Sequence, residues 1–594
     1  MFVHLHIHSN YSFLTGAIRI EDLIYRAKES GMNALALTDT NGMYGLIDFA
    51  KLALEEGIKP ILGVQIIEEQ NPEIHTVLLA KNREGYSKIC KIITERQLND
   101  KFSLVDVLKN HFFNYKDDIV TLTSSIKLLQ LLKKDLDINK LRNIYIELFS
   151  VKKNNPLSLS IRKKSRELYD FAKENHLPIV ATNPVYFLKR EDYLIHKVLL
   201  AIKFNTTLSH VEYVLKNIVD SQSEYKVKTR KFHDRKTKTT ENKFSFKKDI
   251  SKKIFYSLVN EESYFKTSDE MVSLWRAIPE AIENTIKIAN ECNVDLEFGK
   301  YKHPKFPLPE GETAFSYLWK IAFRGLEERY KPLTRQAVER LQEELSVIEH
   351  LGFADYFLIV WDIVQQARKM NMMILGRGSA ANSIVAYCLG ITQIDPLKHN
   401  LFFERFLNLG RASPPDIDLD FSWKERDSII KYVFEKYGYD KVAMISTTVT
   451  FRARSAFREV AKVFGMSDYE ISEFSKFIPW TSAENLPYLS EKFPESRHLK
   501  FKDEPWRTIV QIAQKISAFP HHLSIHPGGL VISPEPITNY VALEYAENKG
   551  IGVIITQPDM YPIEDLGLVK IDLLSQRSLA VVKDTMRKIN ESSD

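Results

Sequence analysis

Acidic and apolar residues alternate from residue 416 to residue 421. Because successive side chains of a β-strand point to opposite faces, this segment is expected to form a strand with one acidic and one apolar face. The acidic face is formed by Asp416, Asp418 and Asp420, and the apolar face by Ile417, Leu419 and Phe421. Like charges on one face repel each other and no cation lies close in sequence, so a divalent metal ion is the natural way to neutralise them. An exposed edge strand that only carries acids is the alternative.

A second candidate strand runs from residue 568 to residue 574. Its apolar face is formed by Val569, Ile571 and Leu573. Lys570 and Asp572 then share the opposite face. If folding brings Asp572 beside Asp416 and Asp418, the three carboxylates form a site of the two-metal kind that catalyses phosphoryl transfer.

A glycine motif, Gly376-Arg377-Gly378-Ser379, lies between two apolar runs. This order predicts a strand, a tight turn and a helix. The unpaired N–H groups at the start of such a helix favour a phosphate group. The alternative is a glycine-rich turn in which Ser379 only caps the helix.

The three motifs occur in the order GRGS, PDIDLD and VKID, with FERFL and HPGGLVIS between them. Together they resemble the palm of the alpha-subunit family of bacterial DNA polymerase III, the C-family polymerases. The resemblance implies template-directed DNA synthesis from dNTPs by a nucleotidyltransferase palm similar to that of polymerase beta. It also implies that two Mg²⁺ ions are held by Asp416, Asp418 and Asp572, with Asp420 as a neighbour. The residues that it places around the incoming triphosphate are Arg377, Gly378, Ser379, Arg405 and Lys570. The residues of the motifs GRGSAANS and YSFLTGA resemble the error-prone accessory branch of the family more than the main replicase.

Residues 1 to 205 alternate short apolar strands with helical stretches, which predicts an α/β barrel or a wound sheet. The resemblance implies a multidomain α/β chain, in which a PHP (polymerase and histidinol phosphatase) barrel of the (β/α)7-like type precedes a palm with an inserted helical thumb. The expected bounds are 1–205 for the PHP domain, 206–261 for a linker with a basic insertion, 262–447 for the first part of the palm with a helical lead-in, 448–526 for the thumb, 527–577 for the second part of the palm, and 578–594 for the start of truncated fingers.

The candidate thumb contains a basic helical stripe. Arg454, Arg458 and Lys462 are spaced four residues apart, so they share one helix face. Such a stripe can follow a DNA backbone without reading sequence, although an ordinary amphipathic helix has the same pattern. In the position of the family's thumb, contact with DNA is favoured.

Three histidines near the end of the candidate thumb raise the question of a zinc site. They are His521, His522 and His526. The sequence HPGG is instead interpreted as a turn that leads into the returning palm strand.

The N-terminal histidines His4, His6 and His8 alternate, so a strand would place them on one side. The resemblance to PHP domains implies a site that hydrolyses phosphoesters with metal-activated water. The residues that remain at its ligand positions are His6, His8, Asp39, His75 and Glu147. The positions where His, Glu, Asp and His are expected carry Thr40, Gln65, Pro184 and Tyr186 instead. The loss of four ligands predicts a mainly structural domain that does not hold Zn²⁺ or Mn²⁺. A residual single-metal site at His6 and His8 is the alternative.

The net charge of +5 is concentrated in one segment. Residues 226–253 carry 12 Lys and Arg against 3 Asp and Glu, which leaves a net charge of −4 for the rest of the chain. Residues 221–253 are interpreted as a flexible, solvated insertion rather than a DNA-binding arm. The three widely spaced cysteines do not suggest disulfides or zinc, and no apolar run approaches the ~20 residues of a membrane span. A bacterial cytoplasmic, nucleoid-associated protein without membrane contact is expected.

Two other functions remain open beside DNA polymerase. One is a PHP-type phosphoesterase or exonuclease, which needs the absent ligands. The other is a non-catalytic scaffold fragment that binds DNA, because the sequence stops at Asp594, whereas family members continue with fingers, a clamp-binding region and an OB fold. The expected partners are primer–template DNA and dNTPs, with the sliding clamp and other replisome proteins reached through that missing region.

Overall fold

The computed structural model describes residues 1–114, 117–136, 141, 144–151, 156–220, 259–410, 415–499, 501–546 and 553–593. The predicted basic insertion at 221–253 lies outside these residues. The chain forms two compact units. The first unit contains Met1–Asp295 and Thr448–Leu523, and the second unit contains Leu296–Thr447 and Ser524–Asp594.

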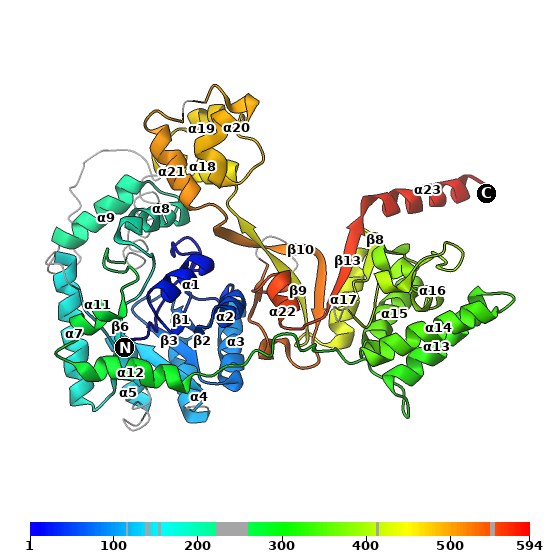
Figure 1. The fold of residues 1–594 in the computed structure, drawn as a ribbon, viewed down its shortest axis with the longest axis horizontal. Coiled ribbons are helices and arrows are strands. Elements are labelled where there is room, and N and C mark those ends of the chain that lie inside the picture. The colour runs from blue at the N-terminus through cyan, green and yellow to red at the C-terminus, as the bar shows by residue number, and fades with distance from the viewer. Residues whose placement is uncertain are drawn as a thin grey trace, which may run out of the picture. The chain divides into compact units, whose positions relative to one another are not determined.

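The first unit is built on a mixed sheet with the strand order β1-β2-β3-β4-β5-β6 (Figure 1). Strand β3 is antiparallel to both of its neighbours, and the other adjacent strands are parallel. The strands are β1 (Ala34–Leu37), β2 (Lys59–Ile67), β3 (His75–Ala80), β4 (Ile119–Thr123), β5 (Ile144–Phe149) and β6 (Ile179–Thr182).

An extended N-terminal segment links the two edges of this sheet. On one side, the N–H of Ala36 donates to the carbonyl of His4 at 2.9 Å. On the other, the N–H of Val185 donates to the carbonyl of His6 at 3.1 Å, and that of His8 donates back to Val185 at 2.8 Å. The strand expected here is therefore an extended segment with a β-bridge between Ile7 and Val185.

Helices alternate with the strands of the first unit, as the sequence predicted. They are α1 (Ile20–Glu29), α2 (Leu46–Glu55), α3 (Arg83–Leu98), α4 (Leu104–Asn114), α5 (Ile126–Asp135), α7 (Pro156–Glu174), α8 (Tyr193–Lys203), α9 (Leu208–Asp220), α11 (Ser268–Leu274) and α12 (Pro279–Glu291). In α1, helical spacing produces one buried face of Ile20, Leu23, Ile24 and Ala27. Helix α12 begins with proline at its first turn and buries Ile288 and Ala289 against the sheet. Residues 262–295, which the sequence grouped with the palm, thus pack in the first unit.

The segment 448–523, here called the helical subdomain, also belongs to the first unit. It contains α18 (Ala453–Val463), α19 (Asp468–Ser475), α20 (Leu489–Lys492) and α21 (Trp506–Lys515), which cluster together (Figure 1). The buried face of α18, including Phe457 and Val460, shares one apolar core with Val198 of α8 and Val211 of α9.

The second unit is built on a sheet with the strand order β11-β12-β9-β10-β13-β8-β7. The strands are β7 (Ile374–Arg377), β8 (Asp418–Ser422), β9 (Val442–Thr450), β10 (Pro520–Ile532), β11 (Leu543–Tyr545), β12 (Ile554–Thr556) and β13 (Lys570–Gln576). Strand β13 is parallel to β8 and antiparallel to β10. The apolar faces predicted for the two acidic strands are buried, with Leu419 and Leu573 fully inaccessible to solvent.

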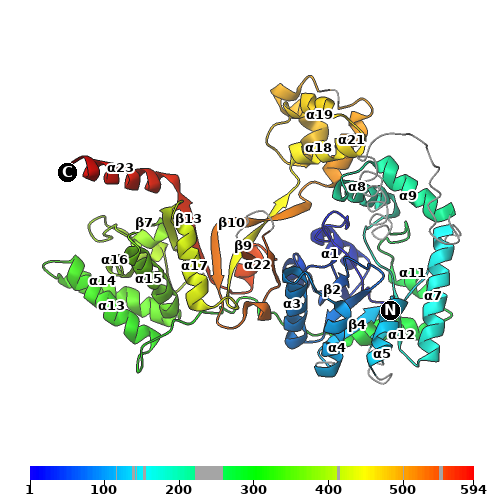
Figure 2. The same ribbon diagram turned by 180° about the vertical axis from the view of Figure 1, so that it is seen from behind.

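The helices of the second unit are α13 (Ala314–Arg329), α14 (Arg335–His350), α15 (Ala354–Lys369), α16 (Ile384–Cys388), α17 (Arg426–Tyr437), α22 (Met560–Asp565) and α23 (Arg577–Ser593). Helix α15 is buried on most of its surface, since it lies between α13 and strand β7 (Figures 1 and 2). Among the described residues, no helix is both long and apolar enough to span a bilayer.

Candidate metal and nucleotide site

Strand pairing brings the three predicted carboxylates together. Asp572 on β13 is in register with Asp418 on β8, and Asp416 lies two residues before the start of β8. One oxygen from each of the three carboxylates lies within 4.8 Å of the others. Asp416 is exposed, Asp418 is half-buried and Asp572 is buried, so the group opens to solvent at one side.

Two cations also reach this site, and both are among the residues that the resemblance placed around the incoming triphosphate. The guanidinium of Arg377 lies 3.1 Å from Asp420 and 3.7 Å from Asp418. The ammonium of Lys570 lies 2.9 Å from Oδ2 of Asp572. Both cations are distant from the acidic strand in sequence, and they reach it because β7 and β13 pair with β8 in the folded sheet.

Asp420 is held by different partners from the other acids of its strand. Besides Arg377, it accepts a hydrogen bond from Nε2 of Gln576 at 3.3 Å. It is not a member of the group of three.

The charges at the site shift the ionisation of its members. Burial and then the charges of Asp416 and Asp572 raise the pKa of Asp418 above its ordinary value. Burial opposes the charged form of Lys570, but its hydrogen bond to Asp572 and the negative charges of Asp572, Asp416 and Glu564 together outweigh burial and raise the pKa of the lysine. A bound cation would relieve the repulsion between the carboxylates.

His526 is a site residue whose role was missed in the sequence. Strand β10 runs without a break through HPGG, so the predicted turn is wrong. The N–H of Gly529 donates to Nδ1 of His526 at 2.6 Å, and Gly529 is in register with Asp572. The same Nδ1 lies 3.7 Å from Oδ1 of Asp572. Finding this histidine requires the register of β10 against β13, which the sequence does not show.

One oxygen of Asp572 is therefore available to a metal ion. Nδ1 of His526 accepts a hydrogen bond and so carries no proton to donate to Asp572. Burial lowers the pKa of His526, which also favours the neutral ring. Among the described residues, Oδ1 of Asp572 is buried without a hydrogen-bond partner. An orphaned carboxylate oxygen beside two further carboxylates fits an oxygen-coordinated divalent cation.

The glycine motif folds differently from the predicted strand–turn–helix. Strand β7 leads into a 3₁₀ helix, Gly378–Asn382, and Gly378 has the left-handed φ of +74°. Helix α16 begins only at Ile384, and its cap is Ser383 rather than Ser379. The hydroxyl of Ser379 donates to the carbonyl of Asp416 at 3.4 Å, which joins this turn to the acidic strand.

The start of α16 is not free to bind a phosphate. The buried carboxylate of Glu344 accepts hydrogen bonds from the N–H groups of Ile384 at 3.1 Å and Val385 at 3.2 Å. It also accepts from the hydroxyl of Ser383 at 2.7 Å and pairs with Arg340 at 2.8 Å. The expected phosphate site at this helix terminus is therefore wrong, because a side chain of α14 fills it.

The remaining predicted nucleotide residue, Arg405, ends a 3₁₀ helix, Phe403–Arg405, that contacts the 3₁₀ helix of the glycine motif. The side chain of Arg405 is exposed. Tyr356 of α15, which the sequence did not single out, is fully buried. Its burial and then the charge of Asp416 raise the pKa of the phenol.

The predicted DNA-binding stripe of α18 makes local contacts in the helical subdomain. The guanidinium of Arg454 donates to the carbonyl of Ile478 at 2.7 Å, and that of Arg458 to the hydroxyl of Ser475 at 3.1 Å. Lys462 pairs with Glu459 at 2.9 Å.

The residues expected at a PHP metal site are tied into internal hydrogen bonds. His6 is bonded to Glu147 at 2.8 Å, and both ring nitrogens of His75 are bonded, to Ser124 and Pro72. Asp39 accepts three hydrogen bonds at 2.7 Å, from the N–H and hydroxyl of Ser9 and the hydroxyl of Ser12. His4 lies apart from them and is bonded to the carbonyl of Lys266 at 2.8 Å.

The residues that replace the expected ligands surround His8. Nδ1 of His8 lies 3.0 Å from the hydroxyl of Ser12 and 3.3 Å from that of Thr40, which in turn donates to Gln65. The ring of Tyr186 stacks on His8 with centroids 4.0 Å apart. Burial lowers the pKa of His8 well below its ordinary value. Thr40 and Tyr186 thus place a hydroxyl and an aromatic ring at positions where the resemblance to PHP domains implies metal ligands, and neither group is a usual ligand of Zn²⁺ or Mn²⁺.

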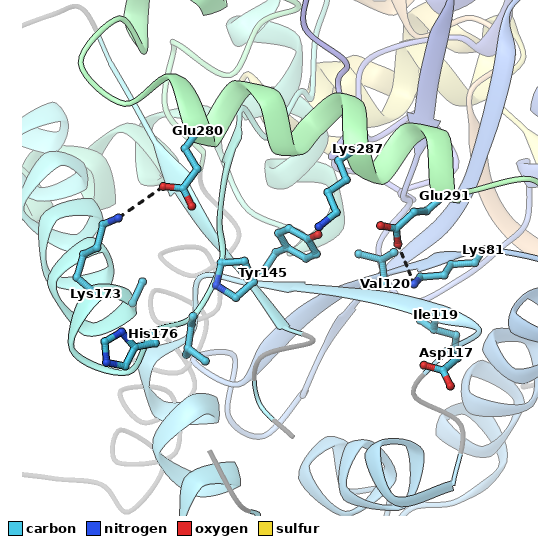
Figure 3. Close-up of a pocket in the computed structure, with 13 residues that line it drawn as sticks. Lys81, Asp117, Ile119, Val120, Tyr145, Lys173, His176, Glu280, Lys287 and Glu291 are labelled. Carbon is cyan, nitrogen blue, oxygen red and sulfur yellow. Dashed lines mark ion pairs between the residues drawn. The ribbon is translucent and has the colours of Figure 1, made fainter. Parts of the chain in front are cut away.

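A cavity of about 550 Å³ lies at the opposite end of the barrel strands, between α12 and the starts of β4 and β5 (Figure 3). Two ion pairs flank it, Lys173–Glu280 at 3.5 Å and Lys81–Glu291 at 2.8 Å. Its charges are thus largely paired with each other.

Comparison with known proteins identifies both parts of the chain. Residues 4–163 match the PHP domain, and residues 316–575 match the bacterial DNA polymerase III alpha NTPase domain. An amidohydrolase structure from Chromobacterium violaceum, 16% identical, covers 31% of this chain and 88% of that chain with a TM-score of 0.20. A TM-score this low is no argument for a shared fold.

Two curated relatives match nearly the whole chain. The error-prone DNA polymerase of Symbiobacterium thermophilum is 33% identical over 99% of this chain and 52% of its own length. The DNA polymerase III subunit alpha of Bacillus subtilis is 33% identical over 100% of this chain and 50% of its own length. The chain spans about half the length of the curated relatives it matches. It belongs to the bacterial DNA polymerase III alpha family and carries that family's PHP and NTPase domains.

Proposed function

We propose that the second unit is the nucleotidyltransferase palm of a DNA polymerase, acting on primer–template DNA and dNTPs. The observation that carries this proposal is the meeting of Asp416, Asp418 and Asp572 across two paired strands. The buried oxygen of Asp572 that lacks a hydrogen-bond partner among the described residues supports the same assignment.

The three carboxylates would hold two Mg²⁺ ions, which supply activation of the primer 3′-hydroxyl and neutralisation of the triphosphate. Lys570, half-buried beside Asp572, fixes a positive charge next to the carboxylates. The triphosphate is proposed to be bound by Arg377, Gly378, Ser379 and Arg405. The turn that carries the first three is hydrogen-bonded to Asp416, and it contacts the 3₁₀ helix that ends at Arg405. Arg377 already contacts Asp418 and Asp420, so it would bind the triphosphate through N–H donors that these contacts do not use.

The helical subdomain is proposed to be the thumb, with Arg454, Arg458 and Lys462 facing the DNA backbone. Arg454 and Arg458 use some of their donors within the subdomain. Each guanidinium has five N–H donors, so others remain for phosphate oxygens.

The PHP domain is proposed to be structural. Its candidate ligands are bonded to each other or to neighbouring hydroxyls, and Thr40, Gln65 and Tyr186 occupy the surroundings of His8. A residual metal site is the alternative, and the Nε2 atoms of His6 and His8, which are buried without a hydrogen-bond partner among the described residues, are the ring nitrogens that a metal ion would use.

Primer extension in the presence of Mg²⁺ tests the proposal. The wild-type chain and the Asp416→Ala, Asp418→Ala variant are compared on a primer–template, with Glu343→Ala, an exposed change on α14, as control. We expect extension by the wild type and the control, and its loss in the double variant. Extension that survives the double substitution contradicts the assignment of the metal site. Failure of all three proteins to extend, with DNA binding retained, favours a non-catalytic scaffold.

A further inference from the structure

The loop of residues 9–19 follows His8, and several of its residues are buried, among them Ser9, Ser12 and Ile18. Three hydrogen bonds of 2.7 Å from Ser9 and Ser12 converge on the buried carboxylate of Asp39. The N–H of Thr40 donates to the hydroxyl of Ser12 at 3.0 Å. Charge-assisted hydrogen bonds of this number and burial hold a loop in one conformation.

The packing of the loop on itself is also tight. The N–H of Asn10 donates to the carbonyl of Ile18 at 2.7 Å, which draws the ends of the loop together. A Cβ atom at Gly16 would lie 1.9 Å from the carbonyl oxygen of Ser9, so only glycine fits there. The N–H of Ala17 donates to the carbonyl of Tyr186 at 2.8 Å.

The far side of this loop contacts the helical subdomain. The guanidinium of Arg19 donates to the carbonyl of Ser517 at 2.8 Å and lies over the ring of Phe519 at 5.6 Å. Leu14 and Ala17 pack against the apolar core that the helical subdomain shares with α8 and α9.

Helix α8 makes a second connection between the same parts. Nδ1 of its buried His196 is bonded to the carbonyl of Thr15 at 2.8 Å, at the centre of the loop. Asp192, just before α8, pairs with Lys515 of α21 at 3.0 Å. The loop, α8 and the helical subdomain therefore form one continuous packed group.

We infer that loop 9–19 positions the helical subdomain, with the Asp39 hydrogen bonds fixing the loop and Arg19 clamping the subdomain. Arg19 and Ser12 are positioning residues. The consequence for DNA binding rests on the proposed function, whereas the mechanical attachment does not.

Hydrogen exchange in the full-length chain tests the attachment without relying on activity. Arg19→Ala removes the clamp, Arg19→Lys keeps a donor for Ser517, and Ser12→Ala removes the support of Asp39. Ser125→Ala is the matched control, since Ser125 is an equally buried serine of the same barrel whose hydroxyl caps α5. We expect protection of α18 and α21 to fall about tenfold in Arg19→Ala and Ser12→Ala, to recover in Arg19→Lys, and to stay unchanged in Ser125→Ala.

Equal loss of protection in the control, or no loss in Arg19→Ala, overturns the inference. If Ser12→Ala does not fold, the partly exposed Arg19 decides the question alone. In primer extension, Arg19→Ala should raise KM for primer–template several-fold and leave kcat and KM for dNTP unchanged. If Arg19→Ala lowers protection but the wild type does not extend a primer, the inference about the loop holds and the proposed polymerase function is contradicted.

Discussion

At the scale of single residues, the candidate site is defined by what each acid contacts. Asp418 and Asp420 lie two residues apart on one strand, yet only Asp418 joins the group with Asp416 and Asp572. Asp420 instead pairs with Arg377 and accepts a hydrogen bond from the amide of Gln576. A role as ligand or neighbour therefore depends on the cross-strand partners and not on the spacing in the sequence.

His526 offers a prediction at this scale. His526→Leu removes the acceptor for the N–H of Gly529 and leaves that donor unpaired, so we expect the free energy of unfolding to fall by about 1–3 kcal/mol. His526→Asn, which retains an acceptor at a similar distance from the backbone, should lose less. Urea denaturation of the three proteins measures the difference. Equal stability of the leucine and asparagine variants would show that the bond to Gly529 is unimportant.

The carboxylates themselves could be predicted from the sequence, because alternation along a strand is a local property. Lys570 could be predicted beside Asp572 in the same way, whereas the contacts of Arg377 and His526 with the acids could not. Arg377, Lys570 and His526 reach the site through the pairing of β7, β8, β10 and β13, which are up to about two hundred residues apart in the chain. A turn was predicted at HPGG because proline and glycine usually interrupt a strand, whereas here β10 passes through them.

At the scale of elements, helices and strands of the first unit alternate as predicted, except that β3 directly follows β2, α4 directly follows α3, and only helices follow β6. Helices such as α1 can be predicted from the spacing of their apolar residues, because these residues recur at helical intervals and form the one buried face. The structure after the glycine motif could not be predicted in this way, because Glu344 of α14 accepts the hydrogen bonds from the first N–H groups of α16. Local sequence cannot show that a carboxylate elsewhere in the chain caps α16.

Glu344 gives the prediction for this scale. Glu344→Ala leaves Arg340 without its carboxylate and two buried N–H groups without an acceptor, so we expect a loss of about 3 kcal/mol of stability. Glu343→Ala, the exposed neighbour on the same turn of α14, should change stability by less than about 0.5 kcal/mol. Denaturant titrations of both variants make the comparison. A similar cost for the two changes would contradict the capping role of Glu344.

At the scale of the whole molecule, the first unit joins the PHP barrel and the helical subdomain, and the second unit carries the candidate palm. The barrel contains several buried histidines. Burial lowers the pKa of His4 and of His196 to about 4. Both rings are therefore neutral in the folded chain at pH 7.

These histidines predict acid sensitivity of the first unit. Since their pKa in the unfolded chain is near 6.5, the unfolded state binds more protons between pH 6.5 and pH 4. The stabilising contribution is complete above pH 6.5 and is lost as pH falls towards 4, by about 2 kcal/mol per histidine at pH 5. Denaturation at pH 7.5 and pH 5 measures the slope. His196→Gln, which keeps a donor for Thr15, should reduce it, and an unchanged slope would exclude His196 as a cause.

The most direct test of the central claim is the binding of Mn²⁺, a spectroscopic substitute for Mg²⁺, followed by electron paramagnetic resonance. This measurement needs neither DNA nor the half of the relatives' length that this chain does not span. We predict that wild-type protein binds the ion, that Asp418→Asn and Asp572→Asn weaken binding at least tenfold, and that Asp420→Asn has little effect. Binding that is unaffected by Asp418→Asn and Asp572→Asn, or that depends equally on Asp420, would contradict the proposed metal site.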